Sequence, residues 1–406
     1  MSNLCRAFAP YHRALPVAPD VDIPRLHAYR LERIRGAMQA QDVALCVLVN
    51  PVSLRYAADW RGYALFQSHI PSYYLFLPVE GPIVLFGTSA KPDIVDEVRP
   101  ARGLNTFDAG LKLDIEARKF AREVQDFLRE IAADNRRVAC ERLSPSAIHA
   151  IADTGIEVVD ADGLMESARY IKSADEIACM RYSVEVAELG MQRMRDLLAP
   201  GITENELWSV LHHTNIAYDG DWIDGRMLAS GTRTNPWLQE ASAKVIEAGD
   251  LVAFDTDMVG PNGYCADISR TFFCGTDKPS SEQKLVYRRA YAEIQHNIDL
   301  LRPGMTFKEF SERAYRQDDE FVPRRYPCVA HGVGMSDEYP KIYYHADWGR
   351  SGYDGVIEAD TVMSIESYVG SIHGTVGVKL EEMVHIRADG CEVLCKYPFE
   401  EALLHG

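Results

Sequence analysis

The sequence lacks the features of a membrane, nucleic-acid-binding or disulfide-stabilised protein. Its 406 residues contain no apolar run long enough to span a bilayer. Lys and Arg number 43 against 60 Asp and Glu, for a net charge of -17, which disfavours nucleic acid and anionic membranes because both need a basic face. The nine cysteines form no paired framework, so we expect free thiols. Residues 1–20 lack an apolar core segment, so we expect no signal peptide and a cytoplasmic location.

The length and the pattern of apolar residues predict two domains, residues 1–168 and 169–406. In the first half, apolar runs predict strands at 43–49, 73–77 and 82–86, the last two forming a hairpin, and helical spacing covers 117–132. This alternation predicts a small α/β domain.

Capping patterns predict the helices of the second half. Ser173 and Thr203 each precede a glutamate by three residues, which predicts one helix to about Leu198 and another ending near Gly220. A third helix is predicted from 282 to about 301, capped by Ser280 or Ser281. Helices that alternate with hairpin strands predict an α+β architecture, in which a curved antiparallel sheet has helices behind it.

Acidic residues gather at the ends of two predicted neighbouring strands. The apolar run 251–254 leads into Asp255 and Asp257, and the chain returns through Asp267 after turn residues. Because side chains alternate along a strand, we expect Asp255 and Asp257 to share one face. Converging carboxylates cannot all stay ionised without a counter-charge, so protons or metal ions must lie among them.

Further metal donors follow along the chain. His331 precedes two glycines that would allow close backbone approach, and Glu366 and Glu381 lie in predicted strands. Five carboxylates and one histidine indicate a dinuclear site with oxygen ligands and a single nitrogen. We therefore predict two divalent metal ions held by six residues: Asp255, Asp257, Asp267, His331, Glu366 and Glu381.

This order of donors resembles the pita-bread superfamily of methionine aminopeptidase, prolidase and creatinase. The superfamily pattern of Asp, Asp, His, Glu, Glu falls on Asp255, Asp267, His331, Glu366 and Glu381. The resemblance implies that Asp267 and Glu381 bridge the metals. It also implies a C-terminal pita-bread domain that follows a smaller N-terminal domain of the creatinase and prolidase type.

The chain departs from the peptidases of this superfamily at two histidines near the substrate carbonyl. The stretch 230–239 offers no histidine after its Ser-Gly-x-x-x-Asn-Pro motif, and Asp337 stands where the second histidine is expected. A histidine can stabilise the oxyanion of amide cleavage, whereas a carboxylate would repel it. An aspartate beside a dimetal site is suited instead to taking a proton.

The altered pattern is similar to the dimethylsulfoniopropionate lyases of the DddP type. The similarity lies in five stretches: 233–237, 254–257, 325–326, 331–340 and 377–381. It implies all six ligands, with iron as the first choice of metal and manganese, zinc or cobalt as alternatives. It also implies a homodimer in which the N-terminal domain of one subunit can complete the site of the other.

The implied reaction is a β-elimination that splits this small zwitterion into dimethyl sulfide and acrylate. Asp337 would take the proton next to the substrate carboxylate, while a metal acidifies that C–H bond as a Lewis acid. Aromatic faces attract a sulfonium, so Tyr326 and a tryptophan are the expected substrate contacts. Trp60 is our first choice, and Trp222 and Trp237 are the alternatives.

Two rival interpretations remain open from the sequence. The first is a Xaa-Pro dipeptidase or another small-amide metallohydrolase of the same superfamily, which the missing histidines disfavour. The second is a non-catalytic binding protein that kept the fold, which the intact carboxylate cluster disfavours because burying it would be costly without a purpose.

Overall fold

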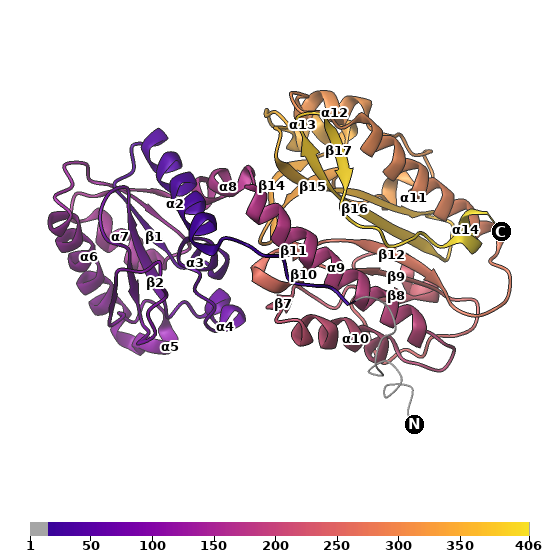
Figure 1. Cartoon of the computed structure of the whole chain (residues 1–406), viewed down its shortest axis with the longest axis horizontal. Coiled ribbons are helices and arrows are strands. Elements are labelled where there is room, and N and C mark those ends of the chain that lie inside the picture. Colours follow the sequence, from indigo (N-terminus) through magenta and orange to yellow (C-terminus); the bar gives the residue numbers. More distant parts are fainter. Residues whose placement is uncertain (1–14, 406) are drawn as a thin grey trace. The chain divides into compact units, whose positions relative to one another are not determined.

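The computed structural model describes residues 15–405. The expectation that residues 1–20 contain no signal peptide therefore falls mostly outside the described residues. The described chain divides into two compact units (Figure 1). Residues 22–170 form the N-terminal unit, and residues 171–405 form the C-terminal unit together with residues 15–21. Among the described residues, no helix combines the length and the apolar character needed to cross a membrane.

The N-terminal unit is built on one six-stranded sheet with the strand order β4-β3-β2-β1-β5-β6. The predicted hairpin is confirmed as the antiparallel pair β2 and β3, whereas β5 pairs in parallel with both β1 and β6. Its strands are β1 (Leu45–Leu48), β2 (Tyr74–Pro78), β3 (Val84–Phe86), β4 (Glu97–Arg99), β5 (Arg137–Cys140) and β6 (Glu157–Asp160). Its helices are α2 (Ile23–Ala40), α3 (Pro51–Ala58), α4 (Ala64–His69), α5 (Thr106–Ala109), α6 (Leu113–Glu130), α7 (Pro145–Ala152) and α8 (Asp162–Tyr170), with a 3-10 turn at Gly110–Lys112.

The predicted helix at 117–132 is α6, which starts four residues earlier than expected and ends at Glu130. It is amphipathic, and Phe120, Val124 and Phe127 are buried in a cluster that includes side chains of β1, β2, β3 and β5. Residues at i, i+4 and i+7 lie on one face of a helix, so this stripe supplies the core of the N-terminal unit.

The C-terminal unit holds three antiparallel sheets, with strand orders β11-β10-β7, β12-β9-β8 and β14-β13-β15-β16-β17. Its strands are β7 (Trp222–Ile223), β8 (Leu228–Ser230), β9 (Leu251–Asp255), β10 (Met258–Val259), β11 (Cys265–Ala266), β12 (Ser269–Phe273), β13 (Ala330–Val333), β14 (Asp337–Ile342), β15 (Thr361–Gly370), β16 (Gly377–Arg387) and β17 (Gly390–Val393). The antiparallel sheet that the sequence predicts is therefore present as several packed sheets.

The predicted capping boxes of this unit are confirmed at Ser173 and Thr203, and a third is present at Ser280 with Gln283. The helices are α9 (Ala174–Leu197), α10 (Glu204–Ala217), α11 (Ser281–Leu300), α12 (Phe307–Arg313), α13 (His345–Ser351) and α14 (Glu401–Leu404), with 3-10 turns at Gly231–Thr234, Pro261–Gly263 and Val322–Arg324. α10 ends before Gly220 because the chain turns at Asp219, where φ is 66°. α9 packs against α10, and α11 packs against β15 and β16 (Figure 1).

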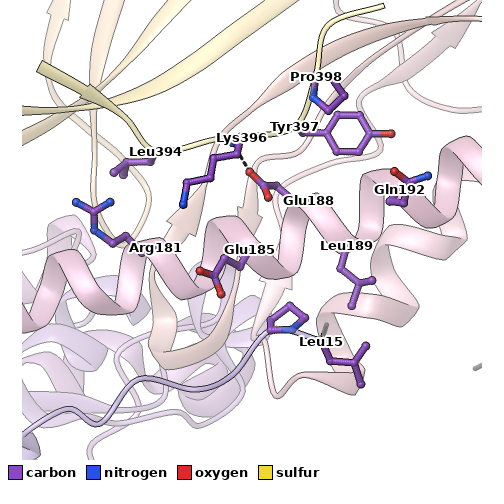
Figure 2. Close-up of a pocket in the computed structure, with 11 residues that line it drawn as sticks. Leu15, Arg181, Glu185, Glu188, Leu189, Gln192, Leu394, Lys396, Tyr397 and Pro398 are labelled. Carbon is purple, nitrogen blue, oxygen red and sulfur yellow. Dashed lines mark hydrogen bonds between the residues drawn. The ribbon is translucent and has the colours of Figure 1, made fainter. Parts of the chain in front are cut away.

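A surface cavity lies between α9 and the segment that follows β17 (Figure 2). Its walls carry charges of both signs, from Arg181 and Glu185 on α9 and from Lys396 opposite them. The backbone N–H of Lys396 donates to the Glu188 carboxylate. None of the residues that line this cavity is a predicted metal ligand, so the candidate site lies elsewhere.

Candidate metal centre

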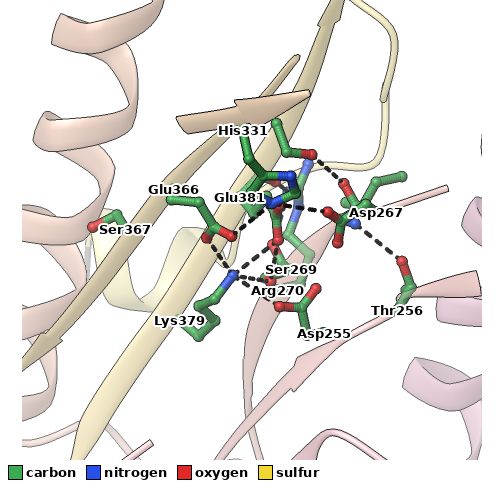
Figure 3. Close-up of polar contacts among 12 residues, drawn as sticks. Asp255, Thr256, Asp267, Ser269, Arg270, His331, Glu366, Ser367, Lys379 and Glu381 are labelled. Carbon is green, nitrogen blue, oxygen red and sulfur yellow. Dashed lines mark hydrogen bonds and ion pairs between the residues drawn. The ribbon is translucent and has the colours of Figure 1, made fainter. Parts of the chain in front are cut away.

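Strand pairing brings the predicted ligands of the C-terminal unit together. Asp255 is the last residue of β9 and pairs with Ser269 of β12, two residues after Asp267. Glu366 on β15 lies directly opposite Glu381 on β16. The antiparallel register thus places acidic side chains from two sheets in one buried cluster (Figure 3).

His331 lies at the centre of contacts with three of these carboxylates. Its Nε2 atom is 3.3 Å from Asp267 Oδ2, 3.3 Å from Glu366 Oε1 and 3.7 Å from Glu381 Oε1. The Nδ1 atom lies 3.0 Å from the Gly332 carbonyl, which orients the ring toward the carboxylates. A single ring nitrogen therefore faces the acidic cluster, as a histidine metal ligand would.

The two glycines after His331 permit the close approach that the sequence predicts. A Cβ on Gly332 would lie 2.3 Å from the Tyr339 carbonyl oxygen, and one on Gly334 would lie 2.2 Å from a Glu338 carboxylate oxygen. The clash at Gly332 is with the backbone, so only glycine fits there and β13 and β14 can pair closely, whereas at Gly334 a Cβ would displace the Glu338 side chain. This pairing sets Asp337 opposite Val333.

Asp337 lies at the rim of the cluster. One of its carboxylate oxygens lies within 4.8 Å of ligand atoms on both Asp267 and His331. Asp337 is exposed, whereas Asp267 and His331 are buried. Asp337, which the sequence predicts to stand in place of the second peptidase histidine, is therefore near the candidate ligands and accessible to a small molecule.

The expectation that Asp255 and Asp257 share a strand face is wrong. β9 ends at Asp255, and Asp257 follows with a φ of 35°, in the left-handed region. Strand alternation does not apply to a residue in this conformation. Asp257 nevertheless lies near Asp255, whose charge helps to raise the pKa of Asp257, after the larger effect of burial.

Three buried carboxylate oxygens in the cluster show that these residues fit a metal. Among residues 15–405, Asp255 Oδ1, Asp267 Oδ1 and Glu381 Oε1 have no hydrogen-bond partner. Ligand oxygens of these same three residues all lie within 4.8 Å of one another. Buried, unpaired anionic oxygens are costly, and hard divalent cations prefer such donors. The donor set therefore fits a metal centre.

The electrostatics of the cluster favour a bound cation. Burial, followed by the neighbouring carboxylates, raises the pKa of both Asp255 and Asp267. Burial disfavours the charged form of His331, but Asp337 and Glu366 outweigh it and raise the pKa of His331 to about 10. The site thus holds more negative charge than it can keep without protons or metal ions.

Lys379 is a member of this cluster that the sequence analysis missed (Figure 3). Its fully buried Nζ atom lies 2.9 Å from Asp255 Oδ2, 2.5 Å from Glu366 Oε2 and 2.8 Å from Glu381 Oε2. Burial alone would lower the pKa of Lys379, yet the carboxylates hold it well above its ordinary value. The sequence feature that could have identified Lys379 is its position two residues before Glu381, because residues i and i+2 of a strand have their side chains on the same face.

Tyr326 lies beside the cluster, and Trp237 packs next to Tyr326. The Lys379 Nζ atom is 4.4 Å from the centre of the Tyr326 ring. Trp237 is buried and packs in an apolar group with Tyr368 and Tyr326. Trp222 is part of β7, and its indole N–H donates to Asp224 Oδ1 at 2.6 Å. Tyr326 is therefore the predicted substrate aromatic that the structure brings to the carboxylates.

Trp60 belongs to the N-terminal unit, whereas all six predicted ligands belong to the C-terminal unit. It lies between α3 and α4 and packs against Tyr73 with 5.5 Å between ring centres. A Cβ on Gly62 would lie 2.4 Å from the indole, so the turn after Trp60 depends on glycine. Contact of Trp60 with substrate stays a prediction.

Comparison with known proteins defines the class of this protein. The model described as metallopeptidase family M24 matches residues 178–388, and that of the creatinase/prolidase N-terminal domain matches residues 30–171. The chain belongs to metallopeptidase family M24 and is an enzyme of that family. The predicted α+β architecture, with a creatinase-type N-terminal domain and a pita-bread C-terminal domain, is confirmed.

Two curated relatives within this class are similar to the chain over most of its length. The dimethylsulfoniopropionate lyase DddP of Roseovarius nubinhibens is 34% identical over 394 residues, which cover 94% of this chain and 88% of the relative. The protein of the same name from Roseobacter denitrificans is 33% identical, over 98% of this chain and 91% of the relative. The predicted resemblance to this type of lyase is thereby confirmed.

Solved structures show the same fold in peptidases. A Xaa-Pro dipeptidase from Bacillus anthracis superposes with a TM-score of 0.73 at 23% identity, covering 92% of this chain and 99% of the other. An X-Pro aminopeptidase from Thermotoga maritima also has a TM-score of 0.73, at 20% identity, covering 91% and 98%. At these identities the similarity shows the fold alone.

Proposed function

We propose that this protein is a metal-dependent lyase that cleaves dimethylsulfoniopropionate to dimethyl sulfide and acrylate by base-catalysed β-elimination. The observation that carries the proposal is the accessible Asp337 carboxylate beside His331 and Asp267. Two lyases of this name, each similar over most of the chain, support it.

Six residues would hold the metals: Asp255, Asp257, Asp267, His331, Glu366 and Glu381. When bound, divalent ions supply Lewis-acid chemistry that polarises a substrate carboxylate. The unpaired oxygens of Asp255, Asp267 and Glu381 are the donors that most need such a partner.

Asp337 would act as the general base. Its carboxylate takes the proton from the carbon next to the substrate carboxylate, and the electron pair of that C–H bond forms the new C=C bond. The carbon–sulfur bond breaks at the same time, and its electrons leave with sulfur as neutral dimethyl sulfide. Acrylate remains, and Asp337 passes its proton to water. No external oxidant or reductant is required.

The cationic end of the substrate needs aromatic or acidic surroundings. We propose Tyr326 as one contact, because its half-buried ring lies next to the carboxylate cluster. Lys379 already lies over this ring, so a sulfonium would bind to a part of the ring that Lys379 leaves open. Trp60 is the proposed second contact, supplied from an N-terminal unit.

The proposal is tested by headspace detection of dimethyl sulfide from purified, metal-loaded protein given dimethylsulfoniopropionate. We expect gas from the wild type and at least a 100-fold lower rate from Asp337→Asn, because a general base typically contributes 10²–10⁴-fold. Asp354→Asn is the control, since Asp354 is exposed in the same unit. Metal content should be equal in all three proteins.

The main alternative is a Xaa-Pro dipeptidase, an interpretation that membership of metallopeptidase family M24 keeps open. A protein shown to hold two metals that releases no dimethyl sulfide but hydrolyses a Xaa-Pro dipeptide would replace our proposal with this one. Undiminished gas release by Asp337→Asn would remove Asp337 from the mechanism.

We also propose that the ions are iron and that the protein is a homodimer. Elemental analysis of protein purified without added metal tests the first point. Light scattering coupled to size exclusion tests the second, and a monomer of 45.6 kDa would contradict it.

A further inference from the structure

We propose that Lys379 is a positioning residue of the candidate metal centre. Its ammonium group binds one oxygen of each of three ligand carboxylates, which leaves the other oxygen of each free to face the metals. This inference goes beyond the lyase proposal, because it applies to any reaction that the centre performs.

The contacts of Lys379 divide the oxygen atoms of the cluster into two sets. Its ammonium contacts Oδ2 of Asp255, Oε2 of Glu366 and Oε2 of Glu381. The second oxygens of Asp255 and Glu381 are buried without a hydrogen-bond partner among the described residues, and that of Glu366 lies 3.3 Å from His331 Nε2. In each of the three carboxylates, the oxygen that Lys379 does not hold is left for a metal or for the histidine ligand.

The side chain of Lys379 is itself held in place. Ser269 Oγ accepts from its Nζ at 2.8 Å and donates to Glu381 Oε2 at 2.9 Å. On the backbone, Lys379 donates to Thr271 Oγ1 at 3.2 Å, and its carbonyl accepts from that hydroxyl at 2.8 Å. β12 therefore anchors both the backbone and the ammonium of Lys379, and a rigid donor can orient the groups it holds.

The charge of Lys379 also matches the ligand set. Five ligand carboxylates carry one negative charge more than two divalent ions would neutralise. The Lys379 ammonium, fully buried among them, supplies the remaining positive charge. The fifth carboxylate, which the five-residue superfamily pattern does not include, is Asp257.

The test compares Lys379→Met with the wild type as full-length protein. Both are stripped of metal and titrated with Co²⁺, and binding is followed by calorimetry and by the visible absorption of the bound ion. Residues that orient metal ligands typically contribute 10–100-fold to affinity, so we expect Co²⁺ to bind 10–100-fold more weakly to the variant, with a changed absorption spectrum. Lys244→Met is the control, because Lys244 pairs with Asp250 at 2.7 Å in the same unit and touches no predicted ligand.

A second variant covers the case in which Lys379→Met does not fold. Ser269→Ala keeps every charge and removes only the hydroxyl that anchors Lys379 and Glu381. We expect Co²⁺ binding roughly 5–30-fold weaker, in keeping with the loss of the two hydrogen bonds that this hydroxyl makes with Lys379 and Glu381. Wild-type affinity and spectrum in either folded variant would overturn the proposal. Tighter binding to Lys379→Met would also overturn it, because Lys379 would then compete with the metals.

Discussion

At the scale of single residues, the candidate centre depends on which oxygen of each carboxylate is free. Asp267 has one oxygen 3.3 Å from His331 Nε2, and its other oxygen is buried without a hydrogen-bond partner among residues 15–405. Without a metal the unpaired oxygen is a cost to the fold, and with a metal it becomes a ligand. The same side chain is thus expected to change the sign of its contribution to stability.

Asp267→Ala tests this change of sign. In chelator-treated protein we expect the variant to unfold at a higher temperature than the wild type, because it no longer buries a carboxyl whose pKa the burial raises. In metal-loaded protein we expect lower metal content and a lower Tm than in the wild type. Elemental analysis and thermal unfolding measure both effects, with Asp354→Ala as the exposed control. A variant that retains full metal content would contradict the ligand assignment.

At the scale of secondary-structure elements, α11 connects to the sheet behind the site through a buried carboxyl. Glu293 accepts hydrogen bonds from Ser367 Oγ at 2.7 Å, from Tyr344 OH at 3.1 Å and from Gln317 Nε2 at 2.8 Å. Ser367 is the neighbour of Glu366 on β15, with its side chain on the opposite face. Burial outweighs these donors and raises the pKa of Glu293 to about 7.

The pH dependence of stability tests the state of Glu293. Between about pH 4.5 and 7 the folded protein keeps a proton on Glu293 that the unfolded chain has lost, so this residue makes the free energy of unfolding fall as pH rises, and the effect levels off above pH 7. Glu293→Gln cannot titrate. The free energy of unfolding of the variant minus that of the wild type should therefore increase by on the order of 2 kcal/mol between pH 5 and 7.5.

Urea unfolding at several pH values measures this difference. Other buried carboxyls, such as Glu141 and Glu382, titrate in both proteins and cancel in the comparison. Glu309→Gln serves as the control, because Glu309 is exposed on α12. A constant difference between Glu293→Gln and wild type over this pH range would rule out the raised pKa.

At the scale of the whole molecule, the chain consists of two units with separate hydrophobic cores. One core is built around β1, β2 and α6, and the other around β15, β16 and α11. All predicted ligands belong to the second unit. A ligand that binds only the folded form of one unit stabilises that unit by mass action.

Calorimetry with and without a chelator tests this separation. We expect two unfolding transitions, one for each unit. Metal removal should lower the free energy of unfolding of the C-terminal unit alone, by ~2.7 kcal/mol if the metal was present at a hundred times its Kd. Fragment 22–170 should unfold at the temperature of the unaffected transition. A single transition that shifts as a whole on chelation would show that the two units unfold together.

The sequence alone determined the features that depend on neighbouring residues. Ser173 with Glu176 and Thr203 with Glu206 start their helices through hydrogen bonds that span three residues. The β2–β3 hairpin likewise follows from two apolar runs around a short turn. The metal donors were recognised by their order along the chain, a pattern that needs no distances.

The tertiary structure decided which atoms face one another. Asp257 leaves the strand because its backbone enters the left-handed region, which the alternation rule cannot foresee. The contact between Ser269 and Glu381 joins residues 112 positions apart, and that between Lys172 and Glu338 joins residues 166 apart. Local patterns carry no information on such pairs, because only the packing of the sheets against one another sets their distances. For that reason the role proposed for Lys379 became visible only in the folded protein.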